Sequence, residues 1–134
     1  ENAWVMAPKP QLIRVFVNLI TNAIQAVEIR QRELEAEGEE MIQGNVVIYL
    51  RNSTKDGYYD VVVDDNGSGV KEENISRLFT PNFTTKSAGT GLGLAICRNI
   101  MEKCGGEISY KRSFALGGAS FTVTIPKKED DEKC

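Results

Sequence analysis

Apolar residues recur along this chain with two different periods, and each period predicts its own kind of element. In the first part they return every three or four positions, the spacing of a helix with one buried face: Leu12, Val15, Phe16, Leu19, Ile20, Ala23 and Val27. The same spacing predicts a second long helix that begins near residues 91–93 and ends at Gly105-Gly106. A short helix is expected over residues 72–79.

Segments rich in β-branched and aromatic residues predict the strands, over 45–51, 58–63, 107–112 and 119–125. The Asp56-Gly57 pair predicts a hairpin between the first two strands, and Gly117-Gly118 a turn between the last two. Residues 2–6 are expected to form a short edge strand. The pattern therefore predicts about three helices layered on a sheet of four or five strands, without the regular alternation of a doubly wound fold.

The chain has 134 residues, enough for one hydrophobic core. We expect one domain over residues 1–126 and a disordered tail over 127–134. Residues 28–43 are rich in Glu, Arg and Gln, and they are either a solvated extension of the first helix or a mobile insertion.

Charge and composition exclude several classes of function. The net charge of -3 argues against a protein that mainly grips nucleic-acid phosphates. No continuous apolar run reaches the roughly 20 residues of a membrane span, so membrane contact by this domain is not expected. Three widely spaced cysteines argue against disulfides or structural zinc and favour a reducing, cytoplasmic compartment. Because the chain has no histidine, it supplies no histidine base, metal ligand or phosphoacceptor.

Two polar motifs stand where the apolar pattern does not explain them. Asn18 and Asn22 lie one helical turn apart, where their amide oxygens suit a Mg²⁺ ion already bound to phosphates, unless both are merely capped by neighbouring backbone. Asp65, Gly67 and Gly69 follow an apolar strand. The carboxylate could accept a hydrogen bond from an exocyclic amine while the glycines let a flat ring approach, although the same residues also suit an ordinary turn.

A third motif, Gly89-Thr-Gly-Leu-Gly-Leu94, opens the second long helix, where backbone N–H groups favour phosphate. Its spacing is neither that of the Rossmann fingerprint nor that of a P-loop. The preceding loop could be a lid in which Lys86 supplies positive charge, and Phe79 and Phe83 either anchor the lid or simply pack in the core.

In this order and spacing, the motifs resemble the ATP-binding catalytic domain of sensor histidine kinases, within the superfamily of gyrase, Hsp90 and MutL. The N box matches at Asn18–Asn22, the G1 box at Asp65–Gly69, the F box at Phe79–Lys86 and the G2 box at Gly89–Leu94. The resemblance implies an α+β fold, a Bergerat-type two-layer sandwich with a mixed sheet of about five strands, three helices and an ATP lid. Asn82 departs from the usual F box, and residues 28–43 are longer than the family's usual connection.

The resemblance also implies roles at a site for ATP and Mg²⁺. Asn22 would coordinate the metal and Asn18 would assist at the phosphates. Asp65 would bind the adenine amino group, and Ser120 would reach Asp65 through water. The remaining cofactor-binding residues implied are Gly67, Gly69 and Val70 around the base, and Phe79, Lys86, Thr90, Gly91, Leu92, Gly93 and Leu94 around the lid and phosphates.

One position separates the branches of the superfamily. Relatives that hydrolyse ATP carry a glutamate one helical turn before the metal-binding asparagine, and here that residue is Asn18, which cannot act as a base. We therefore expect a protein-histidine kinase domain in which Asn18 and Lys86 assist transfer to a histidine on a separate dimerisation domain, with a response regulator downstream. We expect the fragment to be a monomer and the parent protein to be cytoplasmic or anchored in the inner membrane. The alternatives are an ATPase or serine kinase of the same superfamily, or a module that senses nucleotide without chemistry.

Overall fold

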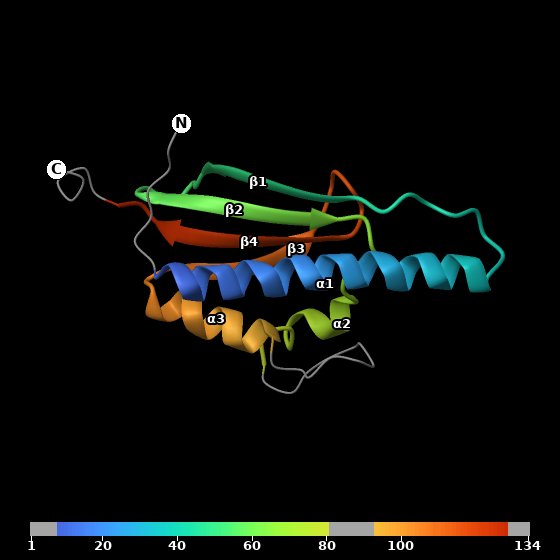
Figure 1. The fold of residues 1–134 in the computed structure, drawn as a ribbon, viewed down its shortest axis with the longest axis horizontal. Coiled ribbons are helices and arrows are strands. Elements are labelled where there is room, and N and C mark those ends of the chain that lie inside the picture. Colours follow the sequence, from blue (N-terminus) through green and yellow to red (C-terminus); the bar gives the residue numbers. More distant parts are fainter. Residues whose placement is uncertain (1–7, 81–92, 129–134) are drawn as a thin grey trace.

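In the computed structural model, which describes residues 8–80 and 93–128, helices pack on one face of a single antiparallel sheet (Figure 1). The strands are β1 (Val46–Asn52), β2 (Tyr58–Asp65), β3 (Glu107–Arg112) and β4 (Ala119–Pro126), in the order β1-β2-β4-β3. All three neighbouring pairs are antiparallel. The predicted α+β sandwich is confirmed, but within the described residues the sheet has four strands rather than about five, and it is antiparallel rather than mixed. The edge strand expected over residues 2–6 lies outside the described residues.

The helices within the described residues are α1 (Lys9–Ala36), α2 (Glu72–Ile75) and α3 (Gly93–Lys103). Helix α1 begins after Pro8, and one side of it is buried through Val15, Leu19, Ala23 and Val27, as the spacing predicts. Val15, Leu19 and Ala23 meet Cys97 and Met101 of α3 and the inward side chains of β2 and β4 in one core. The core therefore lies between two long helices and the two central strands.

Helix α1 is 28 residues long, so the charged stretch begins as a helical extension, which confirms the first of the two alternatives up to Ala36. By length and composition alone α1 could cross a membrane, because polar residues interrupt its apolar run without making it polar overall. In this fold its buried side chains pack on the sheet instead, as in the core helix of a globular domain.

Three boundaries differ from the sequence prediction. Strand β2 continues through Asp64 and Asp65, which were expected in the loop, because the backbone of Asp65 pairs with Val46 of β1. Helix α2 ends at Ile75, four residues early, and the chain continues in turns. The fold also extends past residue 126, since the N–H of Lys127 donates to the carbonyl of Gly57 at 2.9 Å.

Candidate functional site

Asp65 lies at the end of β2 with only 2% of its surface exposed. Its Oδ1 accepts hydrogen bonds from the backbone N–H groups of Gly67, at 2.8 Å, and Ala119, at 3.1 Å. Its main-chain carbonyl accepts a third from Gly118 at 3.1 Å. Because the donors come from the following loop and from the start of β4, the carboxyl group is held in one orientation between two segments distant in sequence.

Glycine is required at two positions around this carboxyl group. A Cβ on Gly118 would overlap both the side chain and the carbonyl of Asp65, so the turn can approach the aspartate only without a side chain. A Cβ on Gly67 would lie 2.8–2.9 Å from the carbonyl group and Cβ of Ala26 in α1. The loop that we call the glycine loop, residues 65–69, is therefore packed directly onto the backbone of α1.

Ser120 does not take the place predicted for it. The β2–β4 register sets Ser120 opposite Asp64, and side chains alternate along a strand, so Ser120 and Asp65 lie on opposite faces of the sheet. The prediction that the Ser120 hydroxyl reaches Asp65 is therefore wrong. The contact from this strand is the backbone N–H of Ala119, the residue before it.

Three aromatic rings support the segment after the glycine loop. The N–H of Val70 donates to the hydroxyl of Tyr110 at 3.0 Å, and the Tyr110 ring lies 5.3 Å from that of Phe121. Phe79 meets Phe121 edge to face, with ring centroids 6.4 Å apart. Phe79 thus packs at the edge of the core, as the simpler of its two interpretations predicted. Its direct contact with nucleotide remains a prediction.

Asn18, the first asparagine of the N box, lies on the face of α1 that meets the start of α3. The Nδ2 of Asn18 donates to the carbonyl of Arg14 at 3.1 Å, a backbone contact of the kind the simpler interpretation expects. Its Oδ1 lies so close to Gly93 that a Cβ there would come within 3.2 Å of it. Asn22 is half-buried one turn further on. The structure therefore brings Asn18 of the N box against the first residue of the second long helix.

Asn18 also neighbours Cys97, the buried cysteine of α3. Burial raises the pKa of the Cys97 thiol to about 11, and a hydrogen bond from Asn18 opposes that rise. The thiol is accordingly a neutral core group at physiological pH, in agreement with the prediction that Cys97 is a small helix residue.

Helix α1 carries contacts to both halves of the predicted site. Asn18, Asn22 and Ala26 follow one another at intervals of four residues, so they share one side of the helix. Asn18 lies against Gly93 at one end of this stripe, and Ala26 lies against Gly67 at the other. Eight residues of helix separate these contacts, about 12 Å along the axis. A ligand between the glycine loop and the start of α3 would therefore lie along α1.

Part of the predicted site is not described. Lys86, Thr90, Gly91 and Leu92, with Phe83 and the rest of the predicted lid, lie outside the described residues. Gly93 and Leu94 are described, and Leu94 packs against the core at the start of α3. Within residues 8–80 and 93–128, no three His, Cys, Asp or Glu side chains group as a metal site.

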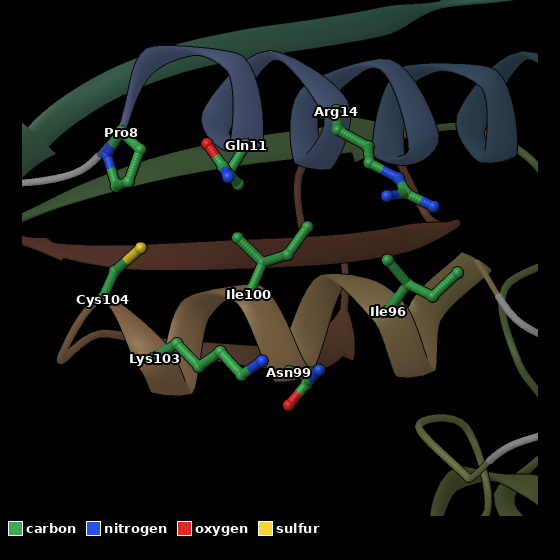
Figure 2. A pocket seen from close by; sticks show the side chains of 8 residues that line it. All are labelled: Pro8, Gln11, Arg14, Ile96, Asn99, Ile100, Lys103 and Cys104. Atoms are coloured by element: carbon green, nitrogen blue, oxygen red, sulfur yellow. The ribbon is translucent and has the colours of Figure 1, made fainter.

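A separate groove of about 540 Å³ opens between the first turns of α1 and the later part of α3. Figure 2 shows Ile96 and Ile100 between the two helices, with the polar ends of Arg14 and Lys103 at its sides. None of the predicted nucleotide residues lines it. The groove is therefore distinct from the predicted site, and no role is assigned to it.

Several residues that shape the site carry no functional motif in the sequence. The sequence predicts Gly118 only as part of a turn and Tyr110 only as a strand residue. Ala119 acts through its backbone N–H, which no side-chain motif reveals. Arg30 belongs to the charged stretch, which gives no sign of a contact with the site, although its guanidinium donates hydrogen bonds to the glycine loop. A period-two reading of β3 could have placed Tyr110 on the core face, but the other contacts depend on long-range packing.

Known proteins were compared with the chain as a whole. The family model described as "Histidine kinase-, DNA gyrase B-, and HSP90-like ATPase" matches residues 8–129. The chain is 38% identical over 122 residues to sensor histidine kinase ZraS of Salmonella typhimurium, covering 91% of this chain and 23% of that protein. It is 36% identical over 127 residues to sensor protein FixL of Bradyrhizobium diazoefficiens, covering 95% and 23%. The chain thus spans about a quarter of the curated relatives it matches.

Solved structures agree with this result. The catalytic domain of histidine kinase ThkA, in a nucleotide-free form, superposes with a TM-score of 0.70 and is 33% identical, covering 90% of this chain and 69% of that one. The residues that the family model matches, 8–129, include Asn18, Asn22 and Asp65. The chain therefore belongs to the histidine kinase-, DNA gyrase B- and HSP90-like ATPases, and within them to the catalytic domains of histidine kinases.

Proposed function

We propose that this domain binds Mg²⁺-ATP along α1 and presents its γ-phosphoryl group to a histidine on a separate dimerisation domain of a larger sensor kinase. The observation that carries the proposal is the buried Asp65 carboxyl group, fixed by the N–H groups of Gly67 and Ala119. A fixed, buried acceptor can select an exocyclic amine such as that of adenine, because a base without the matching donor forms no hydrogen bond with it.

The proposed site has two ends along α1, one that binds the base and one that binds the phosphates and the metal. Asp65 would orient the base, and Gly67 and Gly69 would let it approach the backbone, with Val70 packing beside it. At the other end Asn18 and Asn22 supply neutral amide oxygens, the donors that suit Mg²⁺ bound to phosphates, and the N-terminus of α3 at Gly93 and Leu94 favours negative charge. The bound metal would neutralise charge on the phosphates. The residues therefore fit the pair of ligands, and catalysis would rest on positioning and charge neutralisation.

Two features favour transfer to another domain over hydrolysis. Asn18, which lies against Gly93, has no carboxylate to activate water. The chain has no histidine, and it covers about 23% of the sensor kinases it resembles, so an acceptor would come from another part of such a protein. A response regulator would then take the phosphoryl group, with both steps in the cytoplasm and the parent protein either soluble or anchored in the inner membrane.

Calorimetry with ATP and Mg²⁺ tests the first half of the proposal, with Asp65→Asn as the variant and Asp64→Asn as its matched control. Both carboxyl groups are buried in β2, but they lie on opposite faces of the sheet. We expect Asp65→Asn to lose roughly ten- to a hundredfold in affinity, the value of one hydrogen bond to a charged group, and Asp64→Asn to lose little. Equal affinities in all three proteins would refute the assignment of the adenine site.

Transfer is tested with labelled ATP and a histidine-bearing dimerisation domain. We expect label on the histidine, and none when Asn22→Ala is used or Mg²⁺ is chelated. Rapid release of inorganic phosphate without an acceptor would indicate the ATPase alternative, and label on a serine protein the serine-kinase one. Tight ATP binding with neither reaction would indicate a sensing module.

A further inference from the structure

The charged stretch after the N box has a structural partner that its sequence does not reveal. Helix α1 projects beyond the end of the sheet, and the chain then returns along it to β1 (Figure 1). The side chain of Gln31 donates to the carbonyl of Ile42 at 3.1 Å. A Cβ on Gly44 would come within 2.6 Å of Val27. The returning segment, residues 42–45, is therefore held against the last turns of the helix.

This returning segment forms hydrogen bonds with Asn66, the second residue of the glycine loop. The Oδ1 of Asn66 accepts from the N–H of Asn45 at 2.8 Å, and its Nδ2 donates to the carbonyl of Gln43 at 2.8 Å. The N–H of Asn66 also donates to the carbonyl of Asn45 at 3.2 Å. The loop is thus tied on one side to the segment that follows the charged stretch.

Arg30 ties the loop from the other side. One guanidinium nitrogen of this half-buried residue donates to the carbonyls of Asn66, at 2.9 Å, and Gly67, at 3.3 Å. Hydrogen bonds from a charged donor are stronger than those between neutral groups. By fixing two successive carbonyls, Arg30 sets the peptide planes on both sides of Gly67, and the N–H of Gly67 is one of the two groups that hold the Asp65 carboxylate.

We propose that Arg30 is a positioning residue for nucleotide recognition. It would hold the glycine loop on α1 so that Asp65 faces the base, and the extended α1 with its returning segment would serve as the support. This inference rests on the proposed function, because it concerns the same adenine site. Arg30 itself would touch no nucleotide. It would act on nucleotide affinity by holding the carbonyls of Asn66 and Gly67.

The test compares Arg30→Met, which keeps an unbranched apolar stem and removes the donors, with Arg32→Met, an exposed arginine of the same helix, as the matched control. Calorimetry measures affinity for ATP and for GTP, each with Mg²⁺. We expect Arg30→Met to lose about tenfold in ATP affinity while the weaker GTP affinity stays the same, so that the preference for ATP falls. Arg32→Met should match the wild type, and Arg30→Lys, which keeps a charged donor, should recover part of the preference.

A purely structural role predicts a different result, namely a lower melting temperature with an unchanged ATP-to-GTP preference, and that outcome would overturn the inference. So would an ATP affinity that Arg30→Met leaves unaltered. In the Asp65→Asn background Arg30→Met should have little further effect on affinity, because both changes act on one contact. If Arg30→Met does not fold, the decision falls to Arg30→Lys and to hydrogen exchange at the Gly67 amide, which should quicken. Wild-type protein that fails to bind ATP would instead refute the proposed function.

Discussion

Replacing Gly67 by alanine tests how closely the glycine loop must approach α1. The added methyl group would lie 2.8 Å from the carbonyl carbon of Ala26 and 2.9 Å from its oxygen and Cβ. An ordinary contact begins near 3.4 Å, so the loop must retreat by roughly 0.6 Å, because the helix backbone cannot yield. Overpacking of this kind costs about 1–3 kcal/mol of folding stability.

For a domain of this size, that loss lowers the melting temperature by roughly 3–12 °C. The retreat also moves the N–H of Gly67 away from the Asp65 carboxylate, so we expect ATP affinity to fall about tenfold. Thermal unfolding and calorimetry measure the two effects on the same protein. The double variant Ala26→Gly/Gly67→Ala should recover part of the lost affinity, because it removes the contact with the Ala26 Cβ and leaves those with the carbonyl group. Its melting temperature should not recover, because glycine inside α1 itself costs about 1 kcal/mol.

Gly57→Ala serves as the control. Gly57 has φ +84°, where a side chain is strained, but a Cβ there would meet no atom within 4 Å, and the residue lies in the β1–β2 hairpin. It should lower the melting temperature while ATP affinity stays unchanged. A Gly67→Ala protein with wild-type melting temperature and ATP affinity would contradict the close packing of the loop on α1.

Three further predictions concern the surroundings of the site. Tyr110→Phe leaves the N–H of Val70 without its acceptor. Thermal unfolding should therefore show about 1 kcal/mol lost in stability, and calorimetry a several-fold weaker affinity for ATP. Unchanged stability and affinity would contradict the role of this hydroxyl. Gly118→Ala should reduce stability and ATP affinity together, whereas Gly117→Ala, where a Cβ meets open space at φ +88°, should reduce stability alone when both are measured in the same way. Burial raises the pKa of Cys97 in the folded protein from its ordinary value of 9.0 to about 11, so its contribution to stability is complete below pH 9 and is lost as pH rises through 11. Denaturant unfolding should show a shallower decline over that range in Cys97→Ala, and an identical decline would refute the shift.

The elements that sequence predicted well are those that local patterns determine. The helical spacing from Leu12 to Val27 and the strand composition of residues 107–112 depend on near neighbours, so the start of α1 and both bounds of β3 were predicted closely. The end of α1 at Ala36 lies in the charged stretch, where the spacing left a helical extension and an insertion both open. The end of β2 was misplaced because the pairing of Asp65 with Val46 depends on a strand nearly twenty residues away. Polar residues suggested a loop, but the partner strand extends the sheet.

The candidate site shows the same division. The motif residues Asn18 and Asp65 were recognised as a set, yet the error at Ser120 arose because distance from Pro126 does not fix which face of the sheet a residue occupies. Ala119 contributes a backbone N–H, which any residue except proline could supply, so its identity carries no signal. The contact of Arg30 with Asn66 spans 36 residues of sequence, and a charged stretch is ordinarily a solvated face.

One continuous helix carries Asn18, Ala26 and Arg30. The residues proposed to bind the phosphates and those proposed to support the base are therefore connected by a single rigid element. Twelve residues of α-helix span about 18 Å, and neither end can shift without carrying the other along. A displacement of α1 by a neighbouring domain would therefore disturb both ends of the nucleotide at once. In such a protein, a signal from the neighbouring domain and the bound nucleotide would both act on the position of α1.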